Sequence, residues 1–457
     1  MGIERSVDIR VGSAHLSLES PHPHSLCADF RANGFRLHPQ RIPCDNRGGI
    51  MIDAYSTTAY MFLSMLLLMA TGLPIVYCLG AVGSLAAIFL WGFEALDIVY
   101  FATVDLMNNL ILSAVPLFIF MGFVLHESKI GRDLFDTVHL CSGRLRGALG
   151  IGTMLLCALM AAMLGVSSAT VLSMGVIAVP AMLQKKYDKS LAVGIVQAGG
   201  ALGFLIPPSM MMVMYAFISG VSVGKLFAGG IVPGILLSLI YILYIVILAW
   251  LKPDYAPAME TEEPVCTKIK AKALLELALP LTLIFSILGT IFMGLASPTE
   301  AAAIGAAGSL VCAAIKKRLN LEMLKASCRQ TFAICGFAAY LIIAALIFSK
   351  VYTGLGATTM IKSLVLGLDP NPIVVMALIQ ISFFILGMFM DDIAILFMCM
   401  PIYIPIIIGL GFDPVWFGIL FVVNMQMAYI TPPYGLNLFY MRYDDCKFTR
   451  NTKIFRH

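Results

Sequence analysis

Apolar stretches of about 18 to 25 residues recur along this chain from residue 54 to residue 441. Each is long enough to cross a hydrocarbon core of roughly 30 Å as a helix. Hydrophobic residues make up 60% of the 457 residues, charged residues make up 12%, and the mean hydropathy is +0.92. This composition excludes a soluble domain, and the lack of two-residue alternation disfavours a β-barrel. We therefore expect an all-α polytopic membrane protein.

The residue types that build metal centres and active sites are not arranged for such chemistry. The 11 Cys show no paired spacing, and the 7 His fall outside the expected spans. No nucleophile with a convergent base is visible either. We expect no enzymatic activity, no resident cofactor and no nucleic-acid partner.

The expected spans form two series separated by a charged linker at 252–272. The first series covers 54–251, with spans at 54–71, 74–92, 107–125 and 226–251, an interrupted stretch at 148–184 and a proline-broken helix at 190–219. The second series covers 273–441, with spans at 273–293, 298–315 and 330–349, an interrupted stretch at 373–410 and a proline-broken helix at 414–441.

The two series share a register. In each, one Pro precedes an Asp and then a second Pro at identical spacings; these are Pro180, Asp188 and Pro207, then Pro405, Asp413 and Pro432. Upstream, "SKI" at 128–130 matches "SKV" at 349–351. Several matches in the same order indicate an internal duplication.

The basic residues indicate that the two copies are inverted. Most of the 30 Lys and Arg lie in four connectors and the tail, at 126–147, 184–190, 252–272, 316–329 and from 442. The connectors that alternate with these hold only Lys225, Lys350 and Lys362. By the positive-inside rule, both ends of the first interrupted stretch face the cytoplasm and both ends of the second face outward. Inverted repeats with broken helices are typical of secondary transporters. Because the arm 171–184 has only 14 residues, about 21 Å of helix, we favour re-entrant hairpins over paired spans.

Pro207 and Pro208 break a helix inside an apolar segment, which leaves backbone groups that lipid cannot satisfy. A bound cation would complete them, and oxygen-rich sites suit Na⁺. The candidate Na⁺ and solute residues of the first copy are Ser167, Ser168, Thr170, Gly199, Gly200, Gly203, Pro207 and Pro208. Those of the second copy are Asp391, Asp392, Asn424, Thr431, Pro432, Pro433 and Asn437.

Each of these features has a simpler alternative. Glycines in membrane helices mostly serve close packing, and a double proline is often only a kink. Asp391 and Asp392 are functional candidates inside a membrane, but near the interface they would be solvated turn residues. Glu300 is interpreted as part of a capping box with Ser297, at the start of a span.

Five ordered motifs resemble the large membrane subunit of tripartite ATP-independent periplasmic (TRAP) transporters, over about residues 55–441. They are "GVSSATVLSMGVIAVPAML", "YDKSLAVGIVQAGGALGFLIPPS", "SPTEAAAIGAAG", "GMFMDDIAILFMCMPIYIPII" and "DPVWFGILFVVNMQMAYITPPYGLNLF". The resemblance implies an elevator-type, Na⁺-coupled permease of a bacterial inner membrane. It also implies a small four-helix membrane subunit and a periplasmic solute-binding protein that delivers an organic anion, such as a C4-dicarboxylate.

The sequence departs from the family pattern, which has Pro where Asp392 stands and usually Gly near Ala428. The counterpart of the span 226–251 would start near residue 451, but 442–457 is a polar, basic tail, so the final helix is expected to be missing. Residues 1–52 are expected to be a disordered extension from a start assigned too early.

The alternative functions to a TRAP-type permease are a stand-alone ion-coupled anion carrier, or a truncated permease without activity.

Overall fold

A computed structural model describes residues 54–141, 146–257, 267–358, 361–362, 371–432 and 435–441. Over these ranges the chain is helical and contains no strand. The expectations for residues 1–52, for 442–457 and for much of the linker fall outside the described residues.

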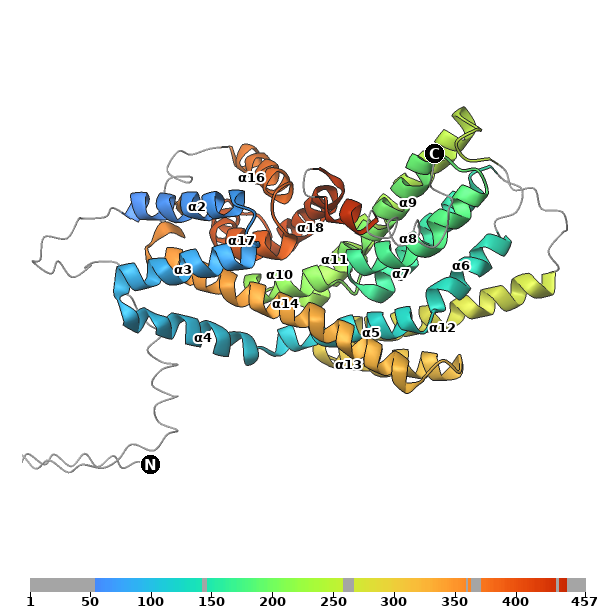
Figure 1. Cartoon of the computed structure of the whole chain (residues 1–457), viewed down its shortest axis with the longest axis horizontal. Helices are drawn as coiled ribbons and strands as arrows, with labels where there is room; N and C mark the ends of the chain where they lie inside the picture. Colours follow the sequence, from blue (N-terminus) through green and yellow to red (C-terminus); the bar gives the residue numbers. More distant parts are fainter. Residues whose placement is uncertain are drawn as a thin grey trace, which may run out of the picture. The chain divides into compact units, whose positions relative to one another are not determined.

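The first series of helices runs from α2 to α11 (Figure 1). Its α-helices are α2 (Ala54–Ala70), α3 (Ile75–Trp91), α4 (Leu96–Met107), α5 (Leu110–Glu127), α6 (Ile130–Cys141), α7 (Ala148–Leu164), α8 (Ser167–Gln184), α9 (Lys189–Ala201), α10 (Met210–Ser219) and α11 (Val223–Leu251). Two short 3₁₀ helices, η1 (Phe93–Ala95) and η2 (Leu202–Phe204), lie between them.

The second series follows the linker. Its helices are α12 (Thr267–Phe292), α13 (Pro298–Ile315), α14 (Leu321–Gly354), α16 (Pro372–Gly387), α17 (Asp392–Gly409) and α18 (Pro414–Ile430), with a further helical turn at 436–441. Among the helices of the described residues, six are long and apolar enough to cross a bilayer: α5, α8, α11, α13, α14 and α17. The chain is a multi-pass membrane protein, as its composition predicts.

Both interruptions and both broken helices occur where the sequence predicts them, but some lengths differ. The polar residues after Val166 belong to α8 and not to the turn, so α8 has 18 residues and is longer than the expected arm. At 1.5 Å per residue it is about 27 Å long, and the length argument for re-entrant hairpins was wrong. The span expected at 330–349 is the 34-residue α14, because Asn320 caps a helix that already starts at Leu321. Helix α12 also begins inside the expected linker.

Helix boundaries repeat at a constant offset between the two series. Helices α8 and α17 both have 18 residues, and they begin at Ser167 and Asp392. The same offset separates the starts of α9 and α18. Each of these is capped by an aspartate, Asp188 or Asp413, that accepts a hydrogen bond from a first-turn N–H. The division into two copies stays a prediction, and this register supports it.

Helices α9 and α18 begin near opposite ends of α11. At the start of α9, the Asp188 N–H donates to the carbonyl of Tyr255, just beyond the end of α11 (3.0 Å). At the start of α18, the Pro414 carbonyl accepts from the Tyr215 hydroxyl of α10 (2.6 Å), and α10 leads directly into the first turn of α11. The two broken helices therefore enter the helix bundle from opposite sides.

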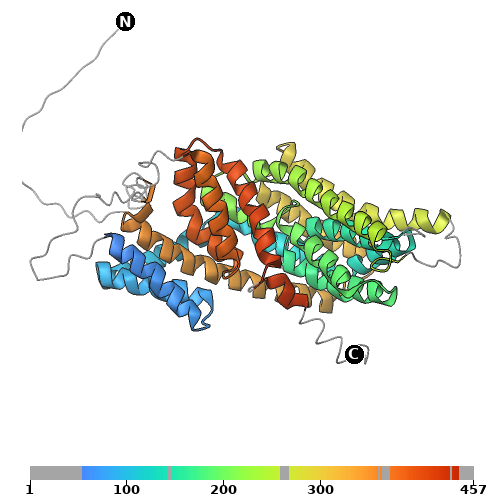
Figure 2. The same cartoon turned by 90° about the horizontal axis from the view of Figure 1, so that it is seen from above.

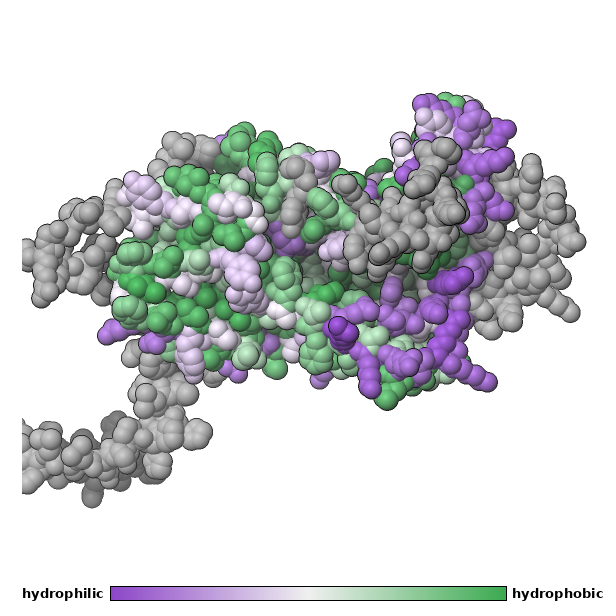
Figure 3. Space-filling model, in the orientation of Figure 1, coloured by the Kyte–Doolittle hydropathy of each residue, from purple (hydrophilic) through white to green (hydrophobic). Residues whose placement is uncertain are grey.

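Connectors with many basic residues lie together. Arg318, after α13, donates to the Ser128 carbonyl (2.8 Å) and to Asp133 of α6 (3.0 Å). Gly147, before α7, donates to the Ala256 carbonyl (3.2 Å). On the face shown in Figure 3, hydrophilic colour gathers around the end of α13. This separation of charge along the bundle is what a bilayer requires.

The long α14 connects two groups of helices. It packs against α3, α5 and α17. Near its end, the Tyr352 hydroxyl donates to the Met398 carbonyl of α17 (2.9 Å). Helices α16, α17 and α18 lie side by side in Figure 2 and pack against one another. Helices α7, α8 and α9 form the corresponding group in the first series.

Candidate functional site

The turn between α7 and α8, named the first tip, packs directly on the break between α9 and α10, named the first break. Gly165 has a φ of +63°, and its carbonyl accepts a hydrogen bond from the N–H of Met210 (3.2 Å). A Cβ on Gly165 would lie 2.6 Å from the carbonyl oxygen of Pro208. The predicted neighbourhood of the first tip and the first proline break is therefore present in the structure.

The three candidate glycines of α9 and η2 are tightly packed. A Cβ on Gly199 would overlap Cys157, and one on Gly200 would overlap Val171. A Cβ on Gly203 would lie 3.2 Å from the carbonyl carbon of Val166. The simpler interpretation of these glycines, close helix packing, is therefore supported for all three.

The local chain also uses some of the carbonyl groups that the break was expected to free. The Leu202 N–H donates to the carbonyls of Gly199 and Gly200. The Ser209 hydroxyl donates to the Phe204 carbonyl (2.6 Å). Pro207 and Pro208, joined by a cis peptide bond, lie between these groups. A cation at this break would share carbonyl oxygens that already accept one hydrogen bond.

The first tip also meets the second broken helix. The Ser167 hydroxyl donates to Asn437 Oδ1 (3.1 Å), and both side chains are fully buried. Ser168, the next residue, lies near Tyr440, one turn after Asn437. The Thr170 hydroxyl donates within its own helix, to the Val166 carbonyl (3.2 Å). The sequence predicted these hydroxyls as site residues, but not that they pair with the other copy.

The turn between α16 and α17, named the second tip, carries two buried carboxylates, Asp391 and Asp392. Asp391 caps α17, and its Oδ2 accepts from the Ile393 N–H (3.3 Å). The Tyr429 hydroxyl lies 2.6 Å from Asp392 Oδ1 and 3.3 Å from Asp391 Oδ1. Asp391 is 8% exposed and Asp392 is 4% exposed. The alternative in which both are solvated turn residues is therefore wrong.

An aromatic contact joins the two breaks. The rings of Phe204 in η2 and Tyr429 in α18 stand edge to face with centroids 4.6 Å apart. Phe204 and Tyr429 are related by the same offset as Ser167 and Asp392, so the contact joins positions that correspond in the two copies. Through Tyr429, the second tip reaches the first broken helix.

The remaining candidates lie further along the second broken helix. Asn424 Nδ2 donates to the carbonyl and to the Oε1 of Gln380 in α16 (2.8 and 3.1 Å). The Thr431 hydroxyl donates to the Met427 carbonyl (2.7 Å), and Pro432 follows it. Pro433 lies outside the described residues. The role of all these residues in binding Na⁺ or solute stays a prediction.

Several buried polar atoms in the described part of α18 and the turn after it have no hydrogen-bond partner. They are Asn424 Oδ1, both amide atoms of Gln426 and Asn437 Nδ2. Buried polar groups are normally paired, so such atoms are candidates for contact with a ligand or water. Gln426 and Tyr429 were missed at the sequence level. A polar side chain inside an apolar span was the available signal.

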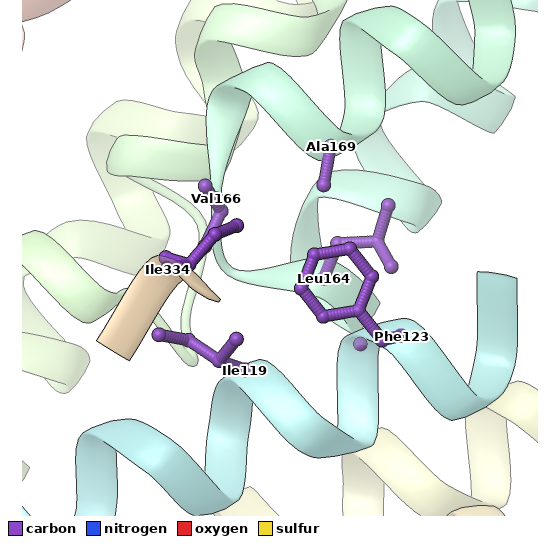
Figure 4. A pocket seen from close by; sticks show the side chains of 7 residues that line it. Ile119, Phe123, Leu164, Val166, Ala169 and Ile334 are labelled. Carbon is purple, nitrogen blue, oxygen red and sulfur yellow. The ribbon is translucent and has the colours of Figure 1, made fainter. Parts of the chain in front are cut away.

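An apolar cavity lies beside the first tip, between α5, α14 and the turn from α7 to α8 (Figure 4). Its lining residues are Ile119, Gly122, Phe123, Leu164, Val166, Ala169 and Ile334. Since none of them carries a polar side chain, the cavity is not part of the polar site.

Glu300 is not part of the site. The Ser297 N–H donates to the Glu300 carboxylate (2.7 Å), and the Glu300 N–H donates back to the Ser297 hydroxyl (3.3 Å). This reciprocal pair is the capping box that the sequence predicts.

Taken together, these features define the class of protein. A multi-pass apolar bundle brings two interrupted helix pairs and two broken helices to one buried polar site, and this arrangement is typical of a membrane transport protein. In the described residues, no group of three or more His, Cys, Asp or Glu could hold a metal ion.

Sequence comparison gives the family. The model of the tripartite ATP-independent periplasmic transporter, DctM component, matches residues 62–443, and the chain belongs to this family. Its relatives are transporter permeases and not enzymes.

Two similar relatives are large permease proteins of C4-dicarboxylate TRAP transporters. The one from Pseudomonas aeruginosa is 38% identical over 333 residues, which is 72% of this chain and 76% of the relative. The one from Vibrio cholerae is 32% identical over 404 residues, covering 83% and 88%. Other relatives are named as permeases for sialic acid, for ectoine and for isethionate.

A solved structure shares the fold. The YdaH transporter of Alcanivorax borkumensis matches with a TM-score of 0.57 at 15% sequence identity. The match covers 84% of this chain and 91% of that protein.

Proposed function

We propose that this chain is the permease subunit that couples Na⁺ entry to the import of an organic anion across a bacterial inner membrane. The observation that carries the proposal is the junction of both copies at one buried polar site. Ser167 of the first tip bonds Asn437 of the second broken helix, and Tyr429 links the two aspartates of the second tip to Phe204.

Inverted topology explains why the two copies meet there. Helices α9 and α18 start near opposite ends of α11, so two halves related by a two-fold axis in the membrane plane would place their breaks near the midplane. We infer that α7–α10 and α16–α18 move together as an elevator that carries the site past the other helices. The closely packed glycines of α9 make the first half of this unit rigid.

The driving force is sufficient for such a carrier. One charge that falls through 100 mV releases about 2.3 kcal/mol, and a tenfold concentration gradient adds about 1.4 kcal/mol per ion. Two Na⁺ ions that enter with one monovalent anion would therefore supply about 5 kcal/mol. With a doubly charged C4-dicarboxylate the electrical contributions cancel, and the two ion gradients would supply about 3 kcal/mol. The two ions correspond to the two tips and breaks.

Membership of the family supports the expected partners: a small four-helix membrane subunit and a periplasmic solute-binding protein. For the solute, the C4-dicarboxylate class is our first proposal, because the relatives from Pseudomonas aeruginosa and Vibrio cholerae carry that name. Relatives named for sialic acid, a carboxylate, and for isethionate, a sulfonate, make organic anions in general the wider class.

The test is uptake into proteoliposomes that contain the permease and small subunit, with the binding protein and radiolabelled succinate or sialic acid outside. An inward Na⁺ gradient should drive accumulation, and replacement of Na⁺ by K⁺ should abolish it. Unchanged uptake in K⁺ would refute Na⁺ coupling. Equal uptake without the binding protein would favour the alternative, a stand-alone ion-coupled carrier.

A further inference from the structure

Three lysines of the described residues adopt a backbone conformation that usually requires glycine. Lys129, Lys186 and Lys317 have φ values of +56°, +62° and +55°, and no other non-glycine residue of the described ranges has a positive φ. Each lies directly after the C-cap of a helix, at the ends of α5, α8 and α13. This left-handed conformation brings Cβ close to the following carbonyl oxygen, so lysine is less stable there than glycine.

The same helix cap carries lysine on one side of the membrane and glycine on the other. Helices α8, α12, α13 and α17 all end in a cap in which two consecutive N–H groups donate back to the last turn. Its left-handed residue is Lys186 in α8 and Lys317 in α13, but Gly294 in α12 and Gly411 in α17. By the positive-inside rule, the first two ends face the cytoplasm and the other two face outward. Lys186 and Gly411 also occupy corresponding positions in the two copies.

Neither the cap nor the helix dipole explains this difference. The cap favours glycine at every left-handed position. The dipole favours a cation at every helix C-terminus, on both sides of the membrane. The inner membrane surface does explain it, because anionic lipids make that surface negative and attract nearby lysines. A strained lysine at such a surface therefore indicates contact with an anion.

Lys129 and Lys317 belong to helix ends that are bonded to each other. The Arg318 guanidinium donates to the Ser128 carbonyl (2.8 Å), so the residue after Lys317 bonds the residue before Lys129. The Lys129 carbonyl accepts from the Arg132 N–H at the start of α6 (3.2 Å). Lys129, Arg132 and Lys317 are all exposed, and we name them the inner cap cluster.

Asp133 is the acidic residue that joins these helix ends, and its charge is already compensated. Its carboxylate lies 3.0 Å from Arg318 Nη2 and 3.5 Å from Lys316 Nζ. Over the described ranges, no ion pair joins the inner cap cluster to an acidic side chain. The cluster therefore presents positive charge to the membrane surface.

An exposed apolar row leads to the cluster along α13. Ile304, Val311 and Ile315 recur at helical spacing, all three are exposed, and Ile315 lies two residues before Lys317. In α8, by contrast, Val176 is the exposed apolar residue, so no such row leads to Lys186. A phospholipid has both a phosphate for the cations and a hydrocarbon chain for the apolar row, whereas a free phosphate has only the first.

We propose that the inner cap cluster binds the phosphate of an anionic phospholipid in the inner leaflet, and that an acyl chain of this lipid lies along the apolar row of α13. Attraction between the phosphate and the cations offsets the backbone strain of the two lysines. The inference goes beyond the proposed function and depends on neither Na⁺ nor the solute.

The experiment measures the thermal unfolding midpoint of the purified permease in micelles of a non-ionic detergent, because a ligand that binds the folded state raises this midpoint. Phosphatidylglycerol, phosphatidylcholine and inorganic phosphate are titrated separately. Phosphatidylglycerol should raise the midpoint of the wild type in a saturable manner. Phosphatidylcholine, which has no net charge, and inorganic phosphate, which has no acyl chain, should have little effect at the same concentration.

Glycine variants test the two lysines without disturbing the fold. Lys129→Gly and Lys317→Gly remove a charge and also relieve the backbone, so the midpoints without lipid should stay close to or above that of the wild type. The apparent dissociation constant for phosphatidylglycerol should rise about fivefold in each single variant and about 20- to 30-fold in the double variant. Weaker lipid binding with an unchanged lipid-free midpoint would not be a folding defect.

The matched control is Lys186→Gly, which makes the same change in the same cap, on a helix without the apolar row. Its apparent dissociation constant should stay within about twofold of the wild type. A rise as large as that of Lys317→Gly would mean that any inner lysine attracts the lipid, and the inference would be overturned. It would also be overturned if phosphatidylglycerol did not stabilise the wild type, if the double variant bound it as the wild type does, or if inorganic phosphate stabilised the wild type equally.

If the double variant does not fold, Arg132→Gln provides the test. This change removes the third charge of the cluster from the exposed surface of α6, and it should raise the apparent dissociation constant for phosphatidylglycerol about fivefold. Unchanged binding in this variant would overturn the inference as well.

Discussion

Replacing Gly165 by alanine adds one methyl group, which should push the first tip away from the proline break. The φ of Gly165, +63°, lies in the left-handed region, and its carbonyl accepts from the Met210 N–H. An alanine Cβ would lie 2.6 Å from the Pro208 carbonyl oxygen. Because this neighbour is backbone, the contact can be relieved only by moving the tip away from the break.

Two costs add up in Gly165→Ala. A left-handed conformation costs a residue with a Cβ about 1–2 kcal/mol, and overpacking costs about 1–3 kcal/mol. The variant should therefore lose about 2–5 kcal/mol of stability at this junction. Gly220→Ala is the matched control, because Gly220 also ends a helix, has a φ of +71° and has no heavy atom near its missing Cβ. It should lose only about 1–2 kcal/mol.

The assay is the thermal unfolding midpoint in detergent, followed by Na⁺-driven uptake in proteoliposomes. The midpoints should fall in the order wild type, Gly220→Ala, Gly165→Ala. Uptake should fall strongly only in Gly165→Ala, since only that change moves the site. Equal midpoints and equal uptake in the two variants would refute the close contact between the tip and the break.

Three further predictions follow from other contacts. In a cysteine-free background, Lys186→Cys and Phe412→Cys should react with an impermeant thiol reagent from opposite faces of the membrane, and reaction from one common face would exclude inverted copies. Tyr429→Phe removes a donor from both carboxylates of the second tip, so half-maximal uptake should need about two- to tenfold more Na⁺, a shift that a purely structural role would not produce. Ser297→Ala removes the capping box and should cost about 1 kcal/mol of stability without altering the Na⁺ requirement of uptake.

The positions of the helices were largely predictable, because local physics determines them. A membrane helix must satisfy its backbone groups internally, so long apolar stretches become helices wherever they occur. Pro207 and Pro208 lack N–H donors, and the helix breaks there as expected. The start of α8 was predicted less well. Ser, Ser, Ala and Thr after Val166 suggested a turn, but inside the protein they belong to the helix, and the Ser167 hydroxyl finds its partner in the second broken helix.

The site was predicted only as a set of residues. Glycines that seemed to free carbonyls are instead closely packed, because helices α7 and α8 approach them. Gln426 and Tyr429 were missed because nothing local distinguishes them from other polar residues in an apolar span.

The sequence alone determined that this chain crosses a membrane many times, where its helices break and that its two halves share a register. These properties depend on hydropathy, on proline and on charge, all of which are local. The packing of the helices, in contrast, sets Ser167 against Asn437, connects both aspartates through Tyr429 to the first break, and leaves particular amide atoms without partners. Hydrogen bonds between residues far apart in the chain depend on how the two copies pack, and no spacing along the sequence encodes that packing.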